Sequence, residues 1–236
     1  MGSIEILKER FKHLKRSNNT KECSGGFIKE FFYRYSFQKL SAKQKILDVG
    51  CGVGHFLKLG KGRAFGIDIN YQTLTKVRRY SDRLVNGDLL HLPFPDASFD
   101  AVNCSHVIEH FSPSDAYQLL SEMDRVLKAD GLVAISTPIL WKGFFDDLTH
   151  VRPYNPSAIM HYYGLNKEQT TRKAIESEYE VEELKWRYTK VTCEPIFLPR
   201  AGILNAILSS LYRLLNKIGF GVYKRTGYTM ILRKTV

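Results

Sequence analysis

Residues 46–57 constrain the fold of this chain more than any other segment. They read Ile-Leu-Asp-Val-Gly-Cys-Gly-Val-Gly-His-Phe-Leu, so apolar β-forming residues run straight into Gly50, Gly52 and Gly54. This pattern predicts a buried strand, a tight turn and the start of a helix. Glycine turns the chain at positive φ and, having no Cβ, lets a ligand lie against the backbone. Asp48 is expected to face such a ligand. The alternative is a glycine-rich turn that binds nothing.

From residue 45 onward the sequence alternates strand-like and helix-like segments. The predicted strands lie near 45–49, 63–68, 83–86, 99–104, 131–136, 178–190 and 228–233, and the predicted helices near 54–59, 71–80, 114–128 and 155–163. Such alternation favours a parallel sheet with helices on both faces.

The second predicted strand ends in an acidic residue, Asp68, which lies 18 positions after Gly50. An acidic residue roughly 20 positions after a glycine loop can accept hydrogen bonds from ribose hydroxyls. The alternative role for Asp68 is the N-cap of the following helix. Asn70 is better placed for that cap, which leaves Asp68 available to a ligand.

The spacing of these residues distinguishes between cofactor classes. A dinucleotide fingerprint reads Gly-x-Gly-x-x-Gly, whereas residues 48–54 read Asp-x-Gly-x-Gly-x-Gly. Gly87-Asp88 and the run Leu-Pro-Phe-Pro-Asp-Ala-Ser-Phe-Asp at 92–100 follow in order. Together these motifs resemble the class I S-adenosylmethionine-dependent methyltransferases over about residues 45–137. The resemblance is to small-molecule, glycan or lipid types, and loosely to the ubiquinone-biosynthesis-like enzymes.

This resemblance carries expectations for the fold and the cofactor. It implies an α/β, Rossmann-like, doubly wound seven-stranded sheet that is mostly parallel, with an antiparallel last strand. It also implies S-adenosylmethionine as the cofactor and S-adenosylhomocysteine as the product. The cofactor-binding positions that it implies are Asp48, Gly50, Gly52, Gly54, Asp68, Ile69, Asp88, Leu89 and Ser105.

The fourth predicted strand runs into Asn-Cys-Ser-His-Val-Ile-Glu-His at 103–110. Methyltransferases that act on base amines usually carry an Asn/Asp-Pro-Pro-Tyr/Phe motif here, and its absence argues against such an acceptor. His106, Glu109 and His110 would share one helical face and could bind a metal. The alternative is that they are ordinary helix residues, and no metal is predicted.

His150, in the loop after the fifth predicted strand, is the first candidate for a catalytic base, and His106 is the second. The reference pKa of histidine suits removal of a hydroxyl proton near neutral pH. The alternative is a structural histidine that holds the loop. With a candidate base present and the amine motif missing, we expect methyl transfer to an oxygen of a small-molecule, glycan or lipid-linked acceptor. The rival hypotheses are an RNA methyltransferase and a non-catalytic cofactor-binding protein.

The net charge of +11 is unevenly distributed. Residues 1–45 carry +7 and residues 195–236 carry +7, while residues 46–194 carry −3. Basic flanks indicate an anionic partner, either membrane lipid or nucleic acid, or else a solubilising surface. Without a recognisable RNA-binding module, nucleic acid is the weaker of the two partners. The sequence shows no signal peptide or long apolar span, so we expect a cytoplasmic protein, with peripheral membrane attachment as an open alternative.

The predicted organisation has two parts. Residues 1–44 form an N-terminal helical cap, with helices at 4–16 and 27–40, and residues 45–236 form the methyltransferase domain with a helical insertion at about 193–227. Within the insertion, 201–218 has a helical pattern with a broad apolar face. That face could meet an anionic membrane surface through residues 200–225, pack on the sheet, or contact a second subunit. The sequence leaves the oligomeric state open.

Overall fold

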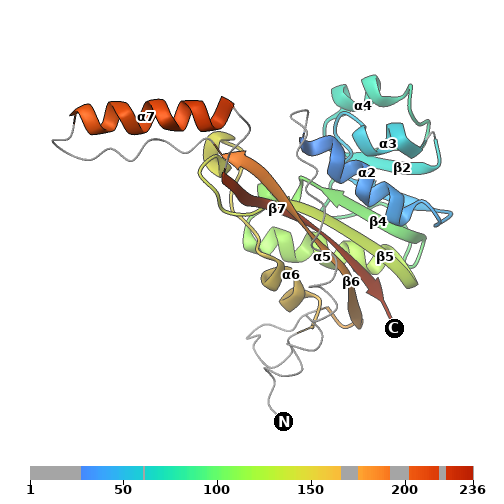
Figure 1. The fold of residues 1–236 in the computed structure, drawn as a ribbon. Coiled ribbons are helices and arrows are strands. Elements are labelled where there is room, and N and C mark those ends of the chain that lie inside the picture. The colour runs from blue at the N-terminus through green and yellow to red at the C-terminus, as the bar shows by residue number, and fades with distance from the viewer. Residues whose placement is uncertain (1–27, 61, 166–174, 192–201, 218–221, 236) are drawn as a thin grey trace, which may run out of the picture.

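A single seven-stranded sheet forms the centre of the molecule, with strand order β3-β2-β1-β4-β5-β7-β6 (Figure 1). The computed structural model describes residues 28–60, 62–165, 175–191, 202–217 and 222–235, so the helix predicted at 4–16 lies outside the described residues. The strands are β1 (Ile46–Val49), β2 (Ala64–Asp68), β3 (Leu84–Asn86), β4 (Phe99–Ser105), β5 (Leu127–Pro138), β6 (Tyr179–Val191) and β7 (Val222–Lys234).

The direction of the strands confirms the predicted architecture. Neighbouring strands from β3 to β5 pair in parallel, whereas β7 runs antiparallel to both β5 and β6. In parallel pairs all carboxyl ends lie at one edge of the sheet, and ligands of open α/β sheets bind outside that edge. The glycines after β1 and the acidic residues after β2 and β3 therefore reach the same edge.

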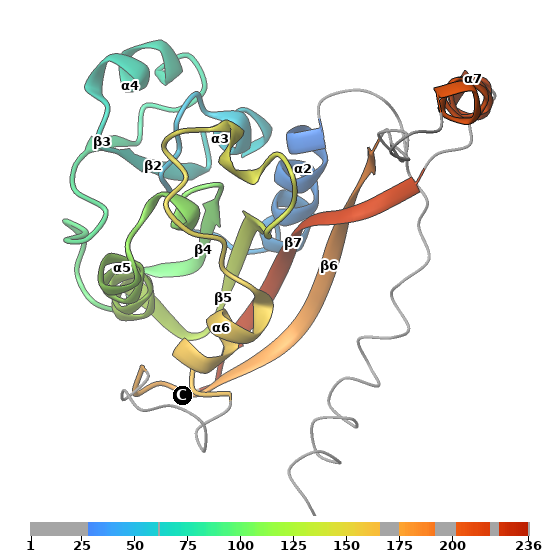
Figure 2. The same cartoon turned by 90° about the vertical axis from the view of Figure 1, so that its left-hand side faces the viewer.

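Helices cover both faces of the sheet (Figure 2). The described helices are α2 (Ile28–Leu40), α3 (His55–Gly60), α4 (Tyr71–Val77), α5 (Pro113–Val126), α6 (Pro156–Tyr162) and α7 (Gly202–Lys217). Ile46 packs in a core with residues of α2, α3 and α4, and its neighbour Leu47 packs in a core with residues of α5 and α6. Strand β1 is thus buried on both faces, which explains its unbroken apolar sequence.

The last strand is longer than its predicted range, whereas β6 has the predicted length and is shifted by one residue. Strand β7 begins at Val222, six residues before the predicted start at 228, because β6 stays paired with it as far as Val191. The segment between the strands is accordingly 192–221, shorter than the predicted insertion at 193–227. Helix α2 packs directly on the sheet, and the proposed division of the chain at residue 44 stays a prediction. No helix among the described residues is long and apolar enough to cross a membrane.

Candidate active site

The glycine loop after β1 has the conformation that its sequence requires. Gly50, Gly52 and Gly54 have φ values of +67°, +47° and +78°, which side chains of L-residues rarely adopt. A Cβ on Gly50 would lie 2.4 Å from Val107 Cγ2, so the loop packs tightly against the segment after β4. A Cβ on Gly52 would meet nothing closer than 4.0 Å. The backbone at Gly52 therefore remains open to close approach by a ligand.

Asp68, at the end of β2, is tied to this loop. Its Oδ2 accepts a hydrogen bond from the backbone N–H of Gly52 (2.8 Å), and its Oδ1 accepts one from Asn70 N–H (2.9 Å). The Asn70 side chain caps α4 by accepting from Thr73 N–H, as predicted. Each carboxylate oxygen has capacity for a second hydrogen bond, so Asp68 can still accept from a ligand hydroxyl. Ile69, the next residue, is exposed on this edge.

The turn after β3 lies beside Asp68, because the N–H of Gly87 donates to the Asp68 carbonyl (3.2 Å). Asp88 is exposed, and its hydrogen bond with His91, together with one from Leu90 N–H, lowers its pKa. Leu89 is buried in the core. This turn therefore presents an ionised carboxylate near the glycine loop, at one of the cofactor-binding positions that the resemblance implies.

Asp48 is buried within β1, with Asn103 Nδ2 donating to its Oδ1 (2.7 Å). Burial raises the pKa of Asp48 to about 7, an effect that the Asn103 hydrogen bond opposes and the charge of Asp68 reinforces. A carboxyl group that titrates near neutral pH is sensitive to the charge of any ligand beside it. A cationic ligand group would favour its ionised form.

Tyr33 is a site residue that the sequence did not single out. Helix α2 places its ring against His55, with centroids 5.1 Å apart, and 6.3 Å from the ring of His106. Burial raises the pKa of Tyr33, and the nearby carboxylates of Asp48 and Glu109 add to this effect. Residues 27–40 contain six aromatic side chains, and the sequence pattern alone does not show which ring would reach the site.

Ser105 is the last residue of β4, and His106 follows it directly. Ser105 is buried, and His106 adopts a positive φ of 58°, an uncommon conformation for a residue with a side chain. The backbone N–H of His106 donates to Ser136 O (2.8 Å), and its Nδ1 lies 3.2 Å from Glu109 Oε1. Strained backbone of this kind is frequent at functional sites, where the surrounding structure maintains it.

Glu109 is completely buried beside these histidines. Burial by itself would raise its pKa, but the hydrogen bond and charge of His106, together with His110, outweigh burial and lower the pKa. Thr137 Oγ1 also donates to Glu109 Oε2 (3.1 Å). Glu109 is therefore a buried, ionised carboxylate held by the ends of β4 and β5.

His150 lies next to this carboxylate although it is far away in sequence. Its ring centroid is 5.0 Å from that of His110, and the Glu109 carbonyl accepts from the N–H of Val151 (2.9 Å). His150 Nδ1 lies 2.6 Å from Phe144 O, and His110 Nδ1 lies 3.1 Å from the carbonyl of the adjacent Thr149. A carbonyl can only accept, so both Nδ1 atoms donate. In the neutral form of each ring, Nε2 is then the nitrogen that carries the lone pair.

Glu109, His110 and His150 form a set that could hold a divalent cation. One ligand atom from each residue lies within 4.8 Å of the other two. Imidazole nitrogens and carboxylates are usual ligands of zinc and other transition metals, and fixing Nδ1–H on a carbonyl is the usual way to orient a metal-binding histidine. Sequence spacing suggested a set of His106, Glu109 and His110. In the structure His106 Nδ1 faces Glu109 Oε1, and His150 replaces His106 as the third member of the set.

Strand order, the glycine loop and the acidic strand ends together define a Rossmann-like fold of the class I methyltransferase type. Residues 47–135 match the family described as "Methyltransferase domain". Residues 47–135 therefore carry a methyltransferase domain, and the predicted resemblance to the class I S-adenosylmethionine-dependent methyltransferases is confirmed.

Relatives and a solved structure agree with this assignment. A probable S-adenosylmethionine-dependent methyltransferase of Mycolicibacterium smegmatis is 34% identical over 157 residues, which cover 62% of this chain and 57% of that protein. A demethylmenaquinone methyltransferase of Lactobacillus johnsonii is 32% identical over 158 residues, which cover 56% of this chain and 63% of that protein. The chain thus spans somewhat more than half the length of these relatives. A crystal structure of an S-adenosylmethionine-dependent methyltransferase from Archaeoglobus fulgidus aligns with this chain with a TM-score of 0.60 at 21% identity. The alignment covers 99% of this chain and 100% of that chain, so the two proteins share a fold.

Proposed function

We propose that this protein transfers a methyl group from S-adenosylmethionine to an oxygen atom of a small-molecule, glycan or lipid-linked acceptor. The observation that carries the proposal is the shared edge of the sheet. There the hydrogen bond from Gly52 to Asp68 joins the glycine loop to an acidic strand end, and the histidines after β4 and β5 lie on the same edge. The half of the edge with the glycine loop and Asp68 suits the cofactor. The half with the histidines suits the acceptor.

The residues at the glycine loop would bind and orient the cofactor, whose sulfonium supplies an electrophilic methyl group. Asp68 would accept hydrogen bonds from two ribose hydroxyls through lone pairs that Gly52 and Asn70 leave available. Asp48 would lie near the positive charge of the methionine part, and Tyr33 would limit the access of water from the α2 side. Holding the acceptor oxygen in line with the methyl group is then the main contribution to the rate.

His150 would accept the proton of the acceptor hydroxyl at Nε2. The Nδ1–H bond to Phe144 O fixes the tautomer that leaves Nε2 basic. Asp147 Oδ2 lies 3.8 Å from His150 Nε2, and its hydrogen bonds with Thr149 lower its pKa, so a negative charge stabilises the imidazolium that forms. His106 would orient Glu109 next to this base. A divalent cation held by Glu109, His110 and His150 would instead polarise the hydroxyl oxygen directly.

Exposed apolar side chains in the segment that carries His150 favour an acceptor with an apolar part. Leu140, Phe145, Leu148 and Val151 are all exposed in the segment that follows β5. Exposed apolar groups that gather beside a reactive residue commonly mark a binding surface. The name of the Lactobacillus johnsonii relative gives demethylmenaquinone as the acceptor of that protein, which supports the same class of acceptor here.

The proposal is tested by supplying S-adenosylmethionine with a labelled methyl group and acceptors from separate classes. Isoprenoid phenols, sugars and glycolipids are the expected classes, and transfer RNA represents the rival. Mass spectrometry should find the label in a methyl ether or ester, and the reaction should proceed equally well after chelator treatment if His150 is the base. Label on RNA would contradict the proposal, and cofactor binding without transfer to any class would favour the non-catalytic alternative.

A further inference from the structure

Helix α7 stands away from the rest of the molecule in two perpendicular views (Figures 1 and 2). Six of its large apolar side chains are between 37% and 82% exposed, namely Ile203, Leu204, Ile207, Leu208, Leu211 and Leu214. The polar residues Asn205 and Ser209 are partly buried. A helix that packs on its own domain shows the opposite distribution. For the side chains that the structure describes, the apolar face is thus directed to the outside and not to the sheet.

The strands that carry α7 reach the edge where the candidate active site lies. Strand β6 ends and β7 begins there, and Ile139 N–H, just after β5, donates to Thr226 O near the start of β7 (3.1 Å). The segment that follows Ile139 contains His150 and also Leu148, whose side chain is 98% exposed. The two exposed apolar surfaces are therefore at the same end of the molecule (Figure 1).

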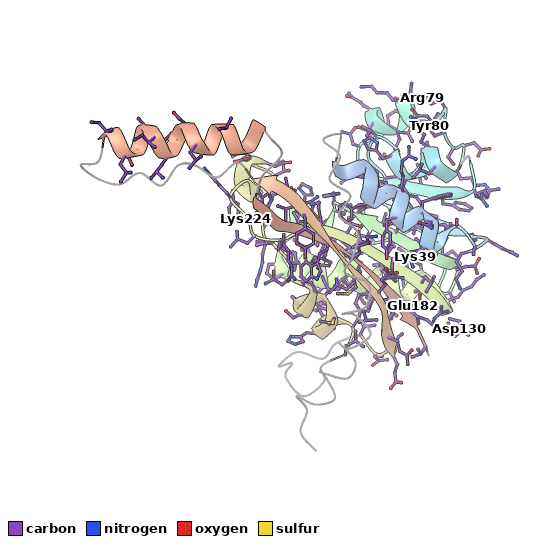
Figure 3. The ribbon with its side chains drawn as sticks, viewed as in Figure 1. Lys39, Arg79, Tyr80, Asp130, Glu182 and Lys224 are labelled. Atoms are coloured by element: carbon purple, nitrogen blue, oxygen red, sulfur yellow. The ribbon has the colours of Figure 1, made fainter. Side chains whose placement is uncertain are left out.

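The charged residues of the segment that contains α7 are all basic. Residues 195–225 contain five Lys or Arg residues and no Asp or Glu. Lys224 and Arg225 are exposed at the beginning of β7, and Figure 3 shows Lys224 at the end of the strand that is nearer to α7. An apolar helical face surrounded by basic residues complements an anionic lipid surface, because the acyl region accepts the apolar side chains and the headgroups attract the cations.

We propose that α7 docks in the plane of an anionic lipid bilayer, with the face formed by Ile203, Ile207, Leu211 and Leu214 in the acyl boundary. Docking in this way turns the edge with His150 toward the bilayer. A lipid-linked acceptor could then reach the site without leaving the membrane. The delivery of an acceptor rests on the proposed function, whereas the docking itself does not.

Vesicle flotation of the full chain tests the docking. The protein should float with vesicles of phosphatidylglycerol and phosphatidylcholine, and more weakly with phosphatidylcholine alone. In the variant Ile207→Gln/Leu211→Gln the vesicle partition coefficient should fall about tenfold or more, because two aliphatic side chains no longer enter the acyl region. The matched control is Ala206→Gln/Ser210→Gln, which places the same two residues about 100° around the helix and should float like the wild type.

Three results would overturn the docking proposal. They are a wild-type protein that does not float, equal flotation of both double variants, and a dimer in sedimentation velocity that only Ile207→Gln/Leu211→Gln dissociates. The last result would assign the apolar face to a second copy of this chain. Calorimetric affinity for S-adenosylhomocysteine should be the same in all three proteins, so a failure of docking and a failure of the proposed function can be told apart.

Discussion

The backbone N–H of Gly52 donates a 2.8 Å hydrogen bond to the carboxylate of Asp68. This bond joins the loop after β1 to the end of β2, and it occupies only one of the acceptor positions of that carboxylate. The same side chain can therefore hold the glycine loop in shape and still bind a ligand. A substitution at Asp68 should disturb both roles at once.

Asp68→Ala should weaken binding of S-adenosylhomocysteine by roughly ten- to a hundredfold, because hydrogen bonds to a charged group contribute ~1.5–3 kcal/mol. Isothermal titration calorimetry measures the change. Asn70→Ala serves as the control, since it removes the cap of α4 and should lower the free energy of unfolding by about 1 kcal/mol while leaving affinity nearly intact. A folded Asp68→Ala protein with wild-type affinity would remove Asp68 from the cofactor site.

His150→Ala should lower the single-turnover rate of methyl transfer by ~10²–10⁴-fold if Nε2 accepts the proton. Cofactor affinity should not change, because His150 belongs to the acceptor half of the edge. His161→Ala, which removes a histidine from α6, is the matched control and should keep the wild-type rate. Equal rates for the His150 variant and the wild type would leave His150 as an anchor of its loop.

Asp48→Asn should change how stability depends on pH. The pKa of Asp48 is about 7 in the folded protein and 3.8 as a reference value, so the folded state holds the proton more tightly. This stabilisation is fully present below the unfolded pKa and is lost as the pH rises through about 7. This pKa difference of about three units corresponds to roughly 4 kcal/mol of folding free energy. Urea unfolding from pH 4 to 8 should therefore show a steeper loss in the wild type than in Asp48→Asn.

An exposed carboxylate supplies the control for that experiment. Asp82→Asn removes a surface charge and should leave the pH dependence of unfolding as in the wild type. Parallel curves for the wild type and Asp48→Asn would show that Asp48 does not carry the elevated pKa.

Gly54→Ala should destabilise the protein more than Gly62→Ala. Both glycines have similar φ values, +78° and +83°, so the backbone strain of alanine is about equal at the two positions. A Cβ at Gly54 would lie 2.6 Å from Val77 Cγ1, whereas at Gly62 it would meet nothing within 4 Å. The strain alone costs about 1–2 kcal/mol, and the contact should add about 1–3 kcal/mol. Chemical denaturation measures the free energy of unfolding of both variants. Equal decreases would mean that α4 shifts to accommodate the added methyl group at Gly54.

Local sequence patterns predicted much of the edge that binds the cofactor. Apolar runs followed by glycines placed β1 and its loop, and the short side chain of Asn70 was recognisable as a cap because it bonds the backbone three residues further on. Parallel strands end at a common edge, so Asp68 and Asp88 had to lie near one another once the strand–helix alternation was known. None of these inferences needs contacts between distant segments beyond the pairing of strands.

The acceptor side was decided by tertiary structure. His150 meets His110 across 40 positions of sequence because the carbonyl of Glu109 anchors the loop that carries it, and loop conformation has no periodic signal in the sequence. Tyr33 reaches the site only through the way α2 packs on the sheet.

By itself, then, the sequence determined the order of the strands along the chain, the glycine loop, the acidic strand ends and the amphipathic pattern of α7. Only the tertiary structure decided that His150 joins Glu109 and that the apolar face of α7, with Leu211 and Leu214, is directed outward. The physical reason is that periodicity shows which side chains share a face of an element. What that face contacts depends on packing between segments that are far apart in the chain.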